Sequence, residues 1–376
     1  MSSTTKKVLI VGCAVALVLG IVIVILGGLA LHRFTSAISS TMEMPAALHT
    51  PGVKTGQGVL TATVMWTGSG VGAVSDIAVG QFNGAAGSQI GVAGSEGAVF
   101  LDGAGNLQSA VTFSRTHGHV DIIDVQGDGT CEFVDCGPSA RGASLIDHRG
   151  QETWHYGGGM PGVDDMAAGD VDGDGELEFA VGFNGGGGVH LLESDGHQVW
   201  RQPDGNVWHV EFVDTNGDGK PEIVHSNAAG QMTIRDAKGT VINRVSPPTY
   251  FSWFSLCRYP GKTGAIYALY STAGSILLVD ASGKVAAQRN APDCGMLGEA
   301  RGTPVKLRAN DAEYLAVLVS FRQWERGVLY VYNRSGQLVY EEVLAQPSGA
   351  TASLTLGNAA TDTLLVGGNG QVLQYR

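Results

Sequence analysis

The sequence predicts an all-β fold made of a repeated unit of about 45 residues, because its composition suits strands and an acidic loop recurs at equal intervals. Glycine accounts for 56 of 376 residues, and charged residues make up only 15%. This balance is typical of short strands joined by tight turns. The first aspartates of the three acidic loops, Asp124, Asp170 and Asp214, lie 46 and 44 residues apart. Such regular spacing predicts one structural unit per repeat.

The second acidic loop belongs to the repeat in which the predicted unit is clearest. Residues 166–169 form a short apolar stretch before the loop, and residues 178–183 alternate as in a strand. Residues 189–193 and 197–201 flank a tight turn at Gly196, whose freedom to adopt positive φ favours a hairpin. Four antiparallel strands in about 45 residues are typical of one blade of a β-propeller.

The hairpin that ends this unit recurs elsewhere, including in repeats without an acidic loop. Six copies are visible, at residues 100–107, 145–152, 189–200, 234–241, 278–285 and 331–338. A last unit, at 353–356, 363–366 and 372–375, supplies only three strands. We expect residues 59–66 to provide the fourth, which would close the ring and cover its exposed edges. The sequence therefore predicts a seven-bladed β-propeller, with six or eight blades as alternatives.

The N-terminal region predicts a membrane anchor. Residues 8–31 contain no charged side chain and exceed the roughly 20 apolar residues that span a bilayer as a helix. Lys6 and Lys7 precede this transmembrane helix, so the positive-inside rule places residues 1–7 in the cytoplasm and the rest outside it. Residues 32–57 are predicted as a linker and residues 58–376 as the propeller. The alternatives are a cleaved signal peptide, lipidation at Cys13 and a buried helix; whether this signal-anchor stays in the mature protein is open.

The acidic loops predict three sites for calcium. Each has oxygen-bearing residues at positions one, three, five and nine, and the backbone carbonyl of position seven can add another ligand. The residues are Asp124, Gln126, Asp128, Thr130 and Glu132 in the first loop, Asp170, Asp172, Asp174, Glu176 and Glu178 in the second, and Asp214, Asn216, Asp218, Lys220 and Glu222 in the third. The alternative is that they are solvated turns. Because such an ion would join two strands of a blade, we expect it to be structural.

These loops, each following a short apolar strand, resemble the FG-GAP or VCBS repeats of integrin α-subunit propellers and many bacterial surface proteins. The resemblance covers about residues 59–376 and implies a propeller with calcium in the three matching loops. The remaining blades lack the acidic cluster, and their Asp-x-x-Gly hairpins resemble the repeats of quinoprotein-type propellers. A quinone-dependent dehydrogenase is disfavoured, however, since the chain has no pair of adjacent cysteines.

A binding surface is expected where the loops that precede the inner strands converge. The candidates for contact with a partner are His117, His119, Trp208 and Trp253, together with His209 and Phe251. The alternative is that these residues fill the central channel. Pairing among the four cysteines outside the anchor, at 131, 136, 257 and 294, is left open.

The sequence therefore predicts a calcium-binding module at the cell surface that binds a protein or a glycan of the cell envelope in adhesion. A net charge of −12 argues against a nucleic-acid partner. Common catalytic motifs are absent, which favours a role without catalysis. An envelope-assembly scaffold and a carbohydrate-active enzyme, such as a lyase or glycosidase, are the alternatives, and the oligomeric state is open.

Overall fold

The computed structural model describes residues 43–82, 84, 87–136, 142–160, 162–251, 253–257, 266–271, 274–292, 298–309, 313–355 and 359–376. The chain divides into two compact units, Met1–Ala46 and Ala47–Arg376. The expected membrane helix at residues 8–31 lies outside the described residues, as do residues 1–7. In the part of the chain that the structure describes, no helix is both long and apolar enough to cross a bilayer.

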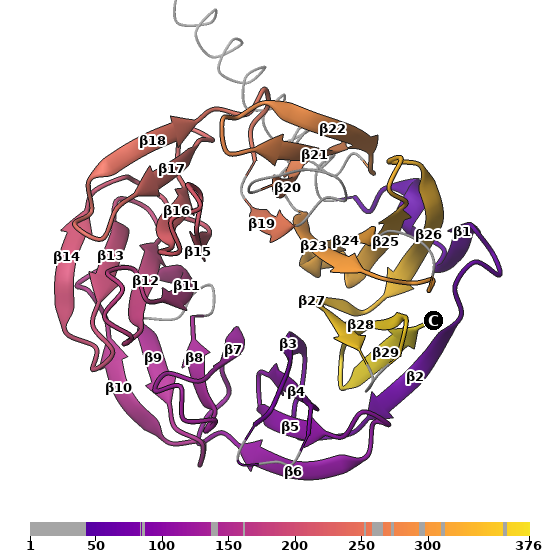
Figure 1. Cartoon of the computed structure of the whole chain (residues 1–376), viewed down its shortest axis with the longest axis horizontal. Helices are drawn as coiled ribbons and strands as arrows, with labels where there is room; N and C mark the ends of the chain where they lie inside the picture. The colour runs from indigo at the N-terminus through magenta and orange to yellow at the C-terminus, as the bar shows by residue number, and fades with distance from the viewer. Residues whose placement is uncertain are drawn as a thin grey trace, which may run out of the picture. The chain divides into compact units, whose positions relative to one another are not determined.

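The second unit is a ring of seven antiparallel sheets, which confirms the predicted seven-bladed propeller (Figure 1). Blade 1 contains β3 (Val74–Gly80), β4 (Gln89–Gly94), β5 (Gly97–Leu101) and β6 (Leu107–Thr112). Blade 2 contains β7 (Val120–Ile123), β8 (Glu132–Asp135), β9 (Ala143–Ile146) and β10 (Glu152–Tyr156). Blade 3 contains β11 (Val163–Gly169), β12 (Glu178–Phe183), β13 (Gly188–Leu192) and β14 (Gln198–Gln202). Blade 4 contains β15 (Val210–Val213), β16 (Glu222–Ser226), β17 (Met232–Arg235) and β18 (Val241–Val245).

The last three blades complete the circle. Blade 5 contains β19 (Phe254–Cys257), β20 (Ile266–Ser271), β21 (Ser275–Asp280) and β22 (Val285–Asn290). Blade 6 contains β23 (Glu299–Val305), β24 (Tyr314–Phe321), β25 (Arg326–Tyr332) and β26 (Leu338–Ala345), with the 3-10 turn η3 (Arg322–Trp324) between β24 and β25. Blade 7 contains β27 (Pro347–Thr355), β28 (Asp362–Gly368) and β29 (Gln371–Tyr375).

The ring closes through an N-terminal strand, as the sequence predicts. Strand β2 (Ala62–Thr67) pairs antiparallel with β29, with Ala62 opposite Tyr375 and Thr67 opposite Gln371. Blade 7 thereby gains its fourth strand, and the edge of β29 is covered. Both ends of the chain of blades are held in one sheet, so no blade is left incomplete.

A second N-terminal strand was not visible in the sequence pattern. Strand β1 (Gly52–Thr55) pairs with β26 and makes blade 6 five-stranded. Just before it, Leu48 at the end of η1 (Ala46–Leu48) is fully buried, and Arg326 Nε donates a hydrogen bond of 3.3 Å to its carbonyl oxygen. These residues fall in the segment 32–57 that the sequence assigns to a linker, so the propeller includes residues that precede Gly58.

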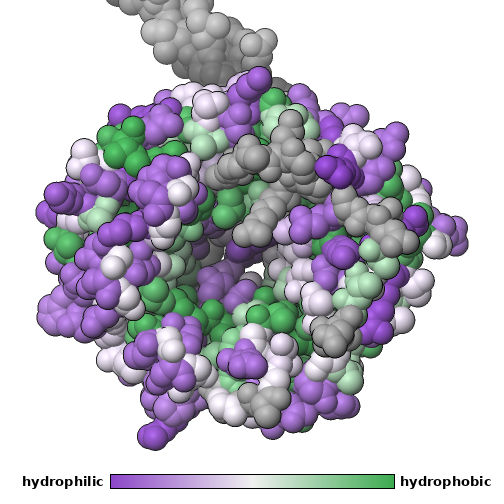
Figure 2. Space-filling view, in the orientation of Figure 1, coloured by the Kyte–Doolittle hydropathy of each residue, from purple (hydrophilic) through white to green (hydrophobic). Residues whose placement is uncertain are grey.

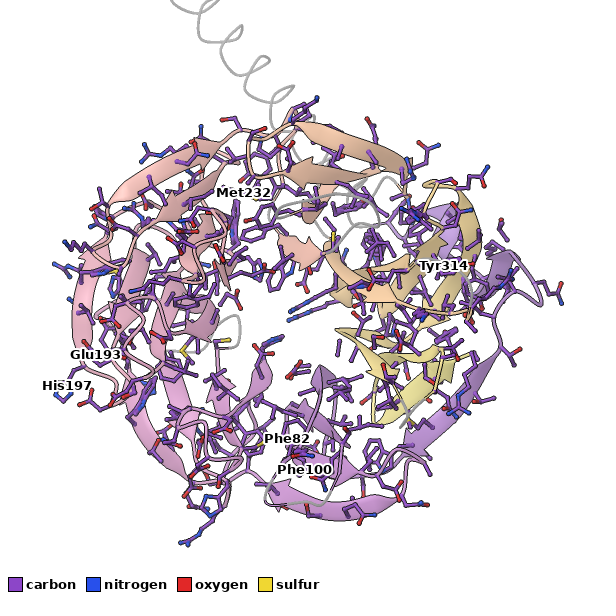
Figure 3. All side chains as sticks on the ribbon, viewed as in Figure 1. Phe82, Phe100, Glu193, His197, Met232 and Tyr314 are labelled. Atoms are coloured by element: carbon purple, nitrogen blue, oxygen red, sulfur yellow. The ribbon has the colours of Figure 1, made fainter. Side chains whose placement is uncertain are left out.

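The core lies between the blades, where sheet packs on sheet. The middle strands β12 and β13 are buried along their whole length, whereas the outer strand β14 is largely exposed. The rings of Phe82 and Phe100 in blade 1 have centroids 5.6 Å apart. Figure 3 labels both, and it shows His197 at the outer rim. Middle strands therefore need apolar residues on both faces, which explains their continuous apolar runs.

The recurrent Asp-x-x-Gly hairpins are explained by turn geometry. Asp102 Oδ1 accepts hydrogen bonds from the backbone N–H groups of Ala104 and Asn106, both at 2.9 Å, and Gly105 has φ of 87°. Asp147 and Asp280 bind their own turns in the same way. The aspartate holds a tight turn that needs a positive φ, which glycine adopts readily and other residues adopt rarely.

These turns also receive the outer strand of the preceding blade. Trp154 Nε1 donates to the carbonyl of Ser194 at 3.1 Å, and Trp200 Nε1 donates to the carbonyl of Ala237 at 2.8 Å. Each tryptophan thus connects an outer strand with the hairpin turn of the next blade. Packing between blades therefore explains why these hairpins resemble the repeats of quinoprotein-type propellers.

Candidate functional site

The three acidic loops join the inner strand to the second strand in blades 2, 3 and 4. Because strands alternate in direction, these loops open on one face of the ring, which we call the acidic face. The loops that precede the inner strands open on the opposite face, which we call the entry face. In each acidic loop both glycines have positive φ, between 67° and 94°. The three loops therefore share positive φ at both glycines, a conformation that glycine adopts readily.

The loop of blade 3 brings three carboxylates together. Single oxygens of Asp170, Asp172 and Asp174 lie within 4.8 Å of one another, close enough to hold one metal ion. Asp170 also accepts hydrogen bonds from the backbone N–H groups of Gly173 and Gly175, at 2.6 and 3.0 Å, which fix the loop around it. The donor set is entirely oxygen and anionic, so it suits a hard divalent cation such as calcium.

Glu176 and Glu178, at positions seven and nine of this loop, differ in environment. Glu176 is exposed and accepts a hydrogen bond of 3.4 Å from Ser194 Oγ. Glu178 is buried and accepts 2.9 Å from the backbone N–H of Val171, which ties the end of the loop to its start. Burial, reinforced by the charges of Asp172 and Asp174, raises the pKa of Glu178 to about 7.

The loop of blade 4 has the same frame but a different arrangement of charge. Asp214 accepts hydrogen bonds from the N–H groups of Gly217 and Gly219, at 2.6 and 2.9 Å. The Asn216 amide donates to Asp218 at 3.0 Å and to Glu222 at 2.6 Å. The Lys220 ammonium donates to the Asp172 carbonyl at 2.5 Å, and this contact links the loops of blades 3 and 4.

The loop of blade 2 is cross-linked by an amide. Asp124 accepts hydrogen bonds from the N–H groups of Asp128 and Gly129, and Asp128 accepts one from Thr130 at 2.7 Å. The Gln126 amide nitrogen, in the orientation that satisfies both partners, donates to both oxygens of Glu132 at 3.2 Å. Gln126 stands at position three of its loop, where the other two loops have Asp172 and Asn216. Its side chain engages the Glu132 carboxylate in hydrogen bonds.

Hydrogen bonds from one inner strand to the next line the central channel. Asp76 accepts the backbone N–H of Ile122 at 3.0 Å, and Asp165 accepts that of Val210 at 2.9 Å. Glu211 continues the series by accepting the N–H of Leu256, at 3.0 and 3.2 Å for its two oxygens. Burial and the charge of Asp121 raise the pKa of Asp76 to about 6. These carboxylates hold neighbouring blades in register.

His209 lies at the centre of this channel wall. Its Nδ1 contacts Asp165 at 2.5 Å and its Nε2 contacts Glu211 at 3.0 Å. Burial disfavours the charged imidazole, but the two carboxylates outweigh burial and raise the pKa of His209 to about 9. Its ring stacks on Trp253 with centroids 4.0 Å apart, and the Arg301 guanidinium lies 5.2 Å from the Trp253 ring centroid. The network crosses blades 3 to 6.

The other candidates for contact with a partner lie in different surroundings. His117 is buried, with its Nδ1 paired to Asp135 and its ring edge-on to Phe113. Trp253 is only 7% exposed, so it is part of the channel wall. Trp208 is half-buried and packs edge-on against Tyr250, with centroids 5.8 Å apart. His119 differs from these residues because it lines a cavity.

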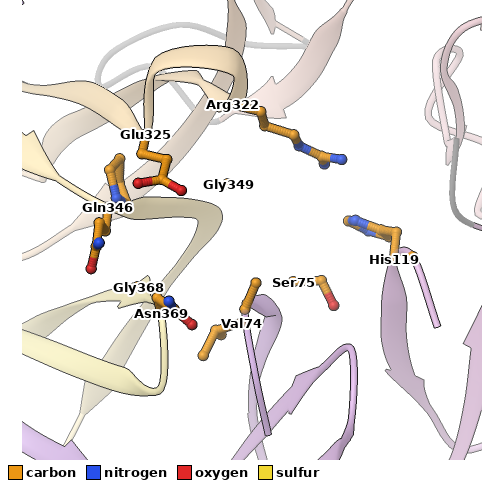
Figure 4. Close-up of a pocket in the computed structure, with 12 residues that line it drawn as sticks. Val74, Ser75, His119, Arg322, Glu325, Gln346, Gly349, Gly368 and Asn369 are labelled. Atoms are coloured by element: carbon orange, nitrogen blue, oxygen red, sulfur yellow. The ribbon is translucent and has the colours of Figure 1, made fainter. Parts of the chain in front are cut away.

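That cavity lies at the mouth of the channel on the entry face and has a volume of about 310 Å³. Figure 2 shows the hollow at the centre of the ring, and Figure 4 shows the pocket itself. We call it the mouth pocket. Its lining comes from blades 1, 2, 6 and 7: Ala73, Val74, Ser75, Gly118, His119, Arg322, Glu325, Gln346, Pro347, Gly349, Gly368 and Asn369.

Of this lining, the sequence pattern singled out only His119. The others stand at strand ends or in connections between strands, and Arg322 and Glu325 lie in residues 322–325 between β24 and β25. The equivalent connection in blade 1, between β4 and β5, has only residues 95 and 96. The equivalent connections in blades 3 and 4 have four and five residues, 184–187 and 227–231, so length does not distinguish the connection of blade 6, and no sequence signal marks Arg322 and Glu325.

Comparison with known proteins agrees with the fold. Residues 170–225 match the model of the FG-GAP-like repeat, a segment that contains the loops of blades 3 and 4. No curated protein sequence matches the chain. The crystal structure of BBS1N in complex with ARL6DN, soaked with mercury, has a TM-score of 0.58 at 13% identity and covers 84% of this chain and 96% of that one.

Two further solved structures are similar at low identity. The lead-soaked crystal of the same BBS1N complex has a TM-score of 0.55 at 13% identity, with 83% of this chain and 96% of that chain covered. The V. cholerae biofilm matrix protein Bap1 has a TM-score of 0.43 at 12% identity, with 84% and 70% covered. From its sheets and the matched segment, the chain is a seven-bladed β-propeller in which residues 170–225 match the FG-GAP-like repeat.

Proposed function

We propose that this chain is a membrane-anchored propeller outside the cytoplasm that holds calcium in its acidic loops and binds a protein or a glycan at the cell envelope. The observation that carries the calcium assignment is the cluster of Asp170, Asp172 and Asp174 within a segment that matches the FG-GAP-like repeat. Three anionic oxygens at the turn between two strands favour a divalent cation.

The proposed role of calcium is to stabilise the blades. An ion in the Asp170 loop would neutralise carboxylates that otherwise repel one another, and it would fix the connection between β11 and β12. Because the native state binds the ion and the unfolded chain does not, calcium should raise the melting temperature in a concentration-dependent way.

The test is thermal unfolding of the chain with calcium and with a chelator. We expect chelation to lower the melting temperature and the double variant D170A/D174A to lose much of that difference. D102A is the control, because it removes an aspartate from a hairpin turn outside the acidic loops. It should lower the melting temperature but keep the calcium response. A melting temperature that is the same with calcium and with the chelator would disprove calcium binding.

The proposed anchor rests on the uncharged run at residues 8–31. With Lys6 and Lys7 before it, the propeller would face the outside. Protease added to intact cells should therefore cleave the propeller, whereas a chain that lacks residues 1–31 should leave the membrane fraction. Protection of the propeller in intact cells would contradict this orientation.

Binding of a partner is supported by the fold. BBS1N, which shares the fold, was crystallised in complex with ARL6DN, so a propeller of this kind binds a protein in that case. The test uses the full chain in detergent as bait, with and without calcium, followed by a glycan array. Failure to capture any protein or glycan under either condition would contradict the proposed binding role.

A further inference from the structure

The mouth pocket carries an inference that rests on the proposed binding function and gives it a ligand class. We propose that this pocket binds an acidic side chain, an aspartate or glutamate, carried by an extended peptide segment of a protein partner. Figure 4 shows the lining: Arg322 and His119 extend toward each other on one side of the cavity, and Glu325, Gln346 and Asn369 lie on the other side.

One side of the pocket offers two hydrogen-bond donors, the Arg322 guanidinium and the His119 imidazole. Arg322 is 45% exposed, and one of its terminal nitrogens is held by Glu299 at 3.3 Å. His119 is held by Asp121, which contacts its Nε2 at 2.9 Å. Burial opposes the charge on His119, but Asp121 outweighs burial and raises the pKa of the imidazole. Each side chain is thus held by one carboxylate while it lines the cavity, and each has a further N–H group that can donate to a carboxylate.

The opposite side offers acceptors. The Glu325 carboxylate and the amides of Gln346 and Asn369 line the same cavity, and all three side chains are exposed. A ligand that satisfies both sides carries a carboxylate at one end and N–H donors a few ångströms away. A peptide has both, because its backbone N–H groups flank the acidic side chain.

The backbone of the pocket is independently unusual. Among the described residues, two that are not glycine have positive φ, Glu325 at 51° and Gln346 at 53°, and both line this cavity. The Gln346 N–H donates to the Glu325 carbonyl at 2.8 Å, so the two strained residues hold each other. Such strain is disfavoured in general and concentrates at ligand sites, where the surrounding structure enforces it.

Size and charge favour one peptide carboxylate over a charged polysaccharide. A cavity of about 310 Å³ has room for one or two residues. The chain as a whole has a net charge of −12, and Asp121 and Glu299 stand directly behind the two cations. A polyanion would meet repulsion over the whole surface and from Glu325, whereas a single carboxylate can bind beside Arg322 and His119 on the side of the pocket away from Glu325.

The experiment measures fluorescence anisotropy of labelled, amidated pentapeptides with the full chain in detergent. The probes are Gly-Gly-Asp-Gly-Gly, the same peptide with Asn in place of Asp, and a labelled galacturonate trisaccharide. We expect the aspartate peptide to bind about tenfold more tightly than the asparagine peptide, because charge-assisted hydrogen bonds are lost with the carboxylate. Equal binding of the two peptides, or tighter binding of the trisaccharide, would overturn the proposal.

Variants locate the binding. R322Q and H119Q should each weaken the aspartate peptide, R322Q by about tenfold, and R322K should recover part of the loss because it keeps the charge. R334Q is the control, since Arg334 is an exposed arginine in the turn between β25 and β26. Unchanged thermal unfolding of each variant shows that it folds. If R322Q binds like the unmodified chain, the pocket is not the site.

The two proposals fail in different ways. If the full chain and R322Q capture the same envelope partner equally, the pocket inference is wrong and the binding module remains. If the full chain captures no partner, the proposed binding function is wrong, whatever affinity the peptides show.

Discussion

At the scale of single residues, glycines in the hairpin turns serve both the turn and the packing between blades. A Cβ on Gly196 would lie 2.9 Å from the Trp154 ring, and the residue has φ of 86°. Gly70 has nearly the same φ, 88°, but a Cβ there would meet nothing within 4 Å. Substitutions at Gly196 and Gly70 therefore separate the cost of backbone strain from the cost of steric conflict.

We therefore predict that G196A destabilises the propeller more than G70A. Left-handed backbone strain alone costs about 1 to 2 kcal/mol, and overpacking against Trp154 adds about 1 to 3 kcal/mol. Chemical unfolding of both variants measures the difference. Equal losses would mean that the Trp154 ring shifts aside without penalty.

His209 gives a residue-scale prediction about pH. Its pKa lies at about 9 in the folded chain against an ordinary value of 6.5, because Asp165 and Glu211 hold the charged form. A raised pKa contributes stability that is complete below pH 6.5 and is lost as the pH rises through about 9. We expect the melting temperature to fall across this range, and to fall less in H209Q. Parallel curves for the two proteins would refute this role of His209.

At the scale of strands and loops, repetition decides what the sequence reveals. The hairpins and acidic loops recur with fixed residues at fixed offsets, so their positions and the blade count could be predicted. Strand β1 is short and mostly exposed, and among the described residues the other six sheets have no fifth strand. Its pairing with β26 depends on where the chain returns in three dimensions, which no local pattern encodes.

The same reason explains why the sequence predicts the acidic loops but not the mouth pocket. Each acidic loop is contiguous, so its spacing alone indicates a site for a cation. The mouth pocket is assembled from connections far apart in the sequence, such as His119 and Arg322. The positive φ of Glu325 and Gln346 leaves no trace in residue type, because both are ordinary polar residues.

An element-scale prediction concerns the start of the propeller. Leu48 is fully buried, so L48A should destabilise the chain by about 2 to 4 kcal/mol through lost burial and a residual cavity. V53A is the matched control in β1, because Val53 is 41% exposed and should change stability by less than about 0.5 kcal/mol. Denaturant unfolding of both variants measures this. A neutral L48A would show that this segment adds nothing to the fold.

At the scale of the whole molecule, stability depends on joining the two ends of the ring. A chain that starts at Gly68 lacks β2 and leaves β29 as an open edge. We predict a lower melting temperature and concentration-dependent association for this chain relative to one that starts at Glu43. A synthetic peptide of residues 56–68 should restore much of the loss, and a scrambled peptide should not. Identical melting of the two chains would exclude β2 as the closing strand.

Because β2 closes the ring, one strand of blade 7 is synthesised long before the strand with which it pairs. Ala62 meets Tyr375, so the strand leaves the ribosome about 300 residues before its partner. At about 5 to 20 residues per second, β2 waits roughly 15 to 60 s without its sheet. Long-range pairing of this kind is slow, because the loop must close before any contact stabilises it. A chain that stops before Gln371 keeps unpaired edges on β2 and β28, and those edges distinguish an unfinished molecule from a finished one.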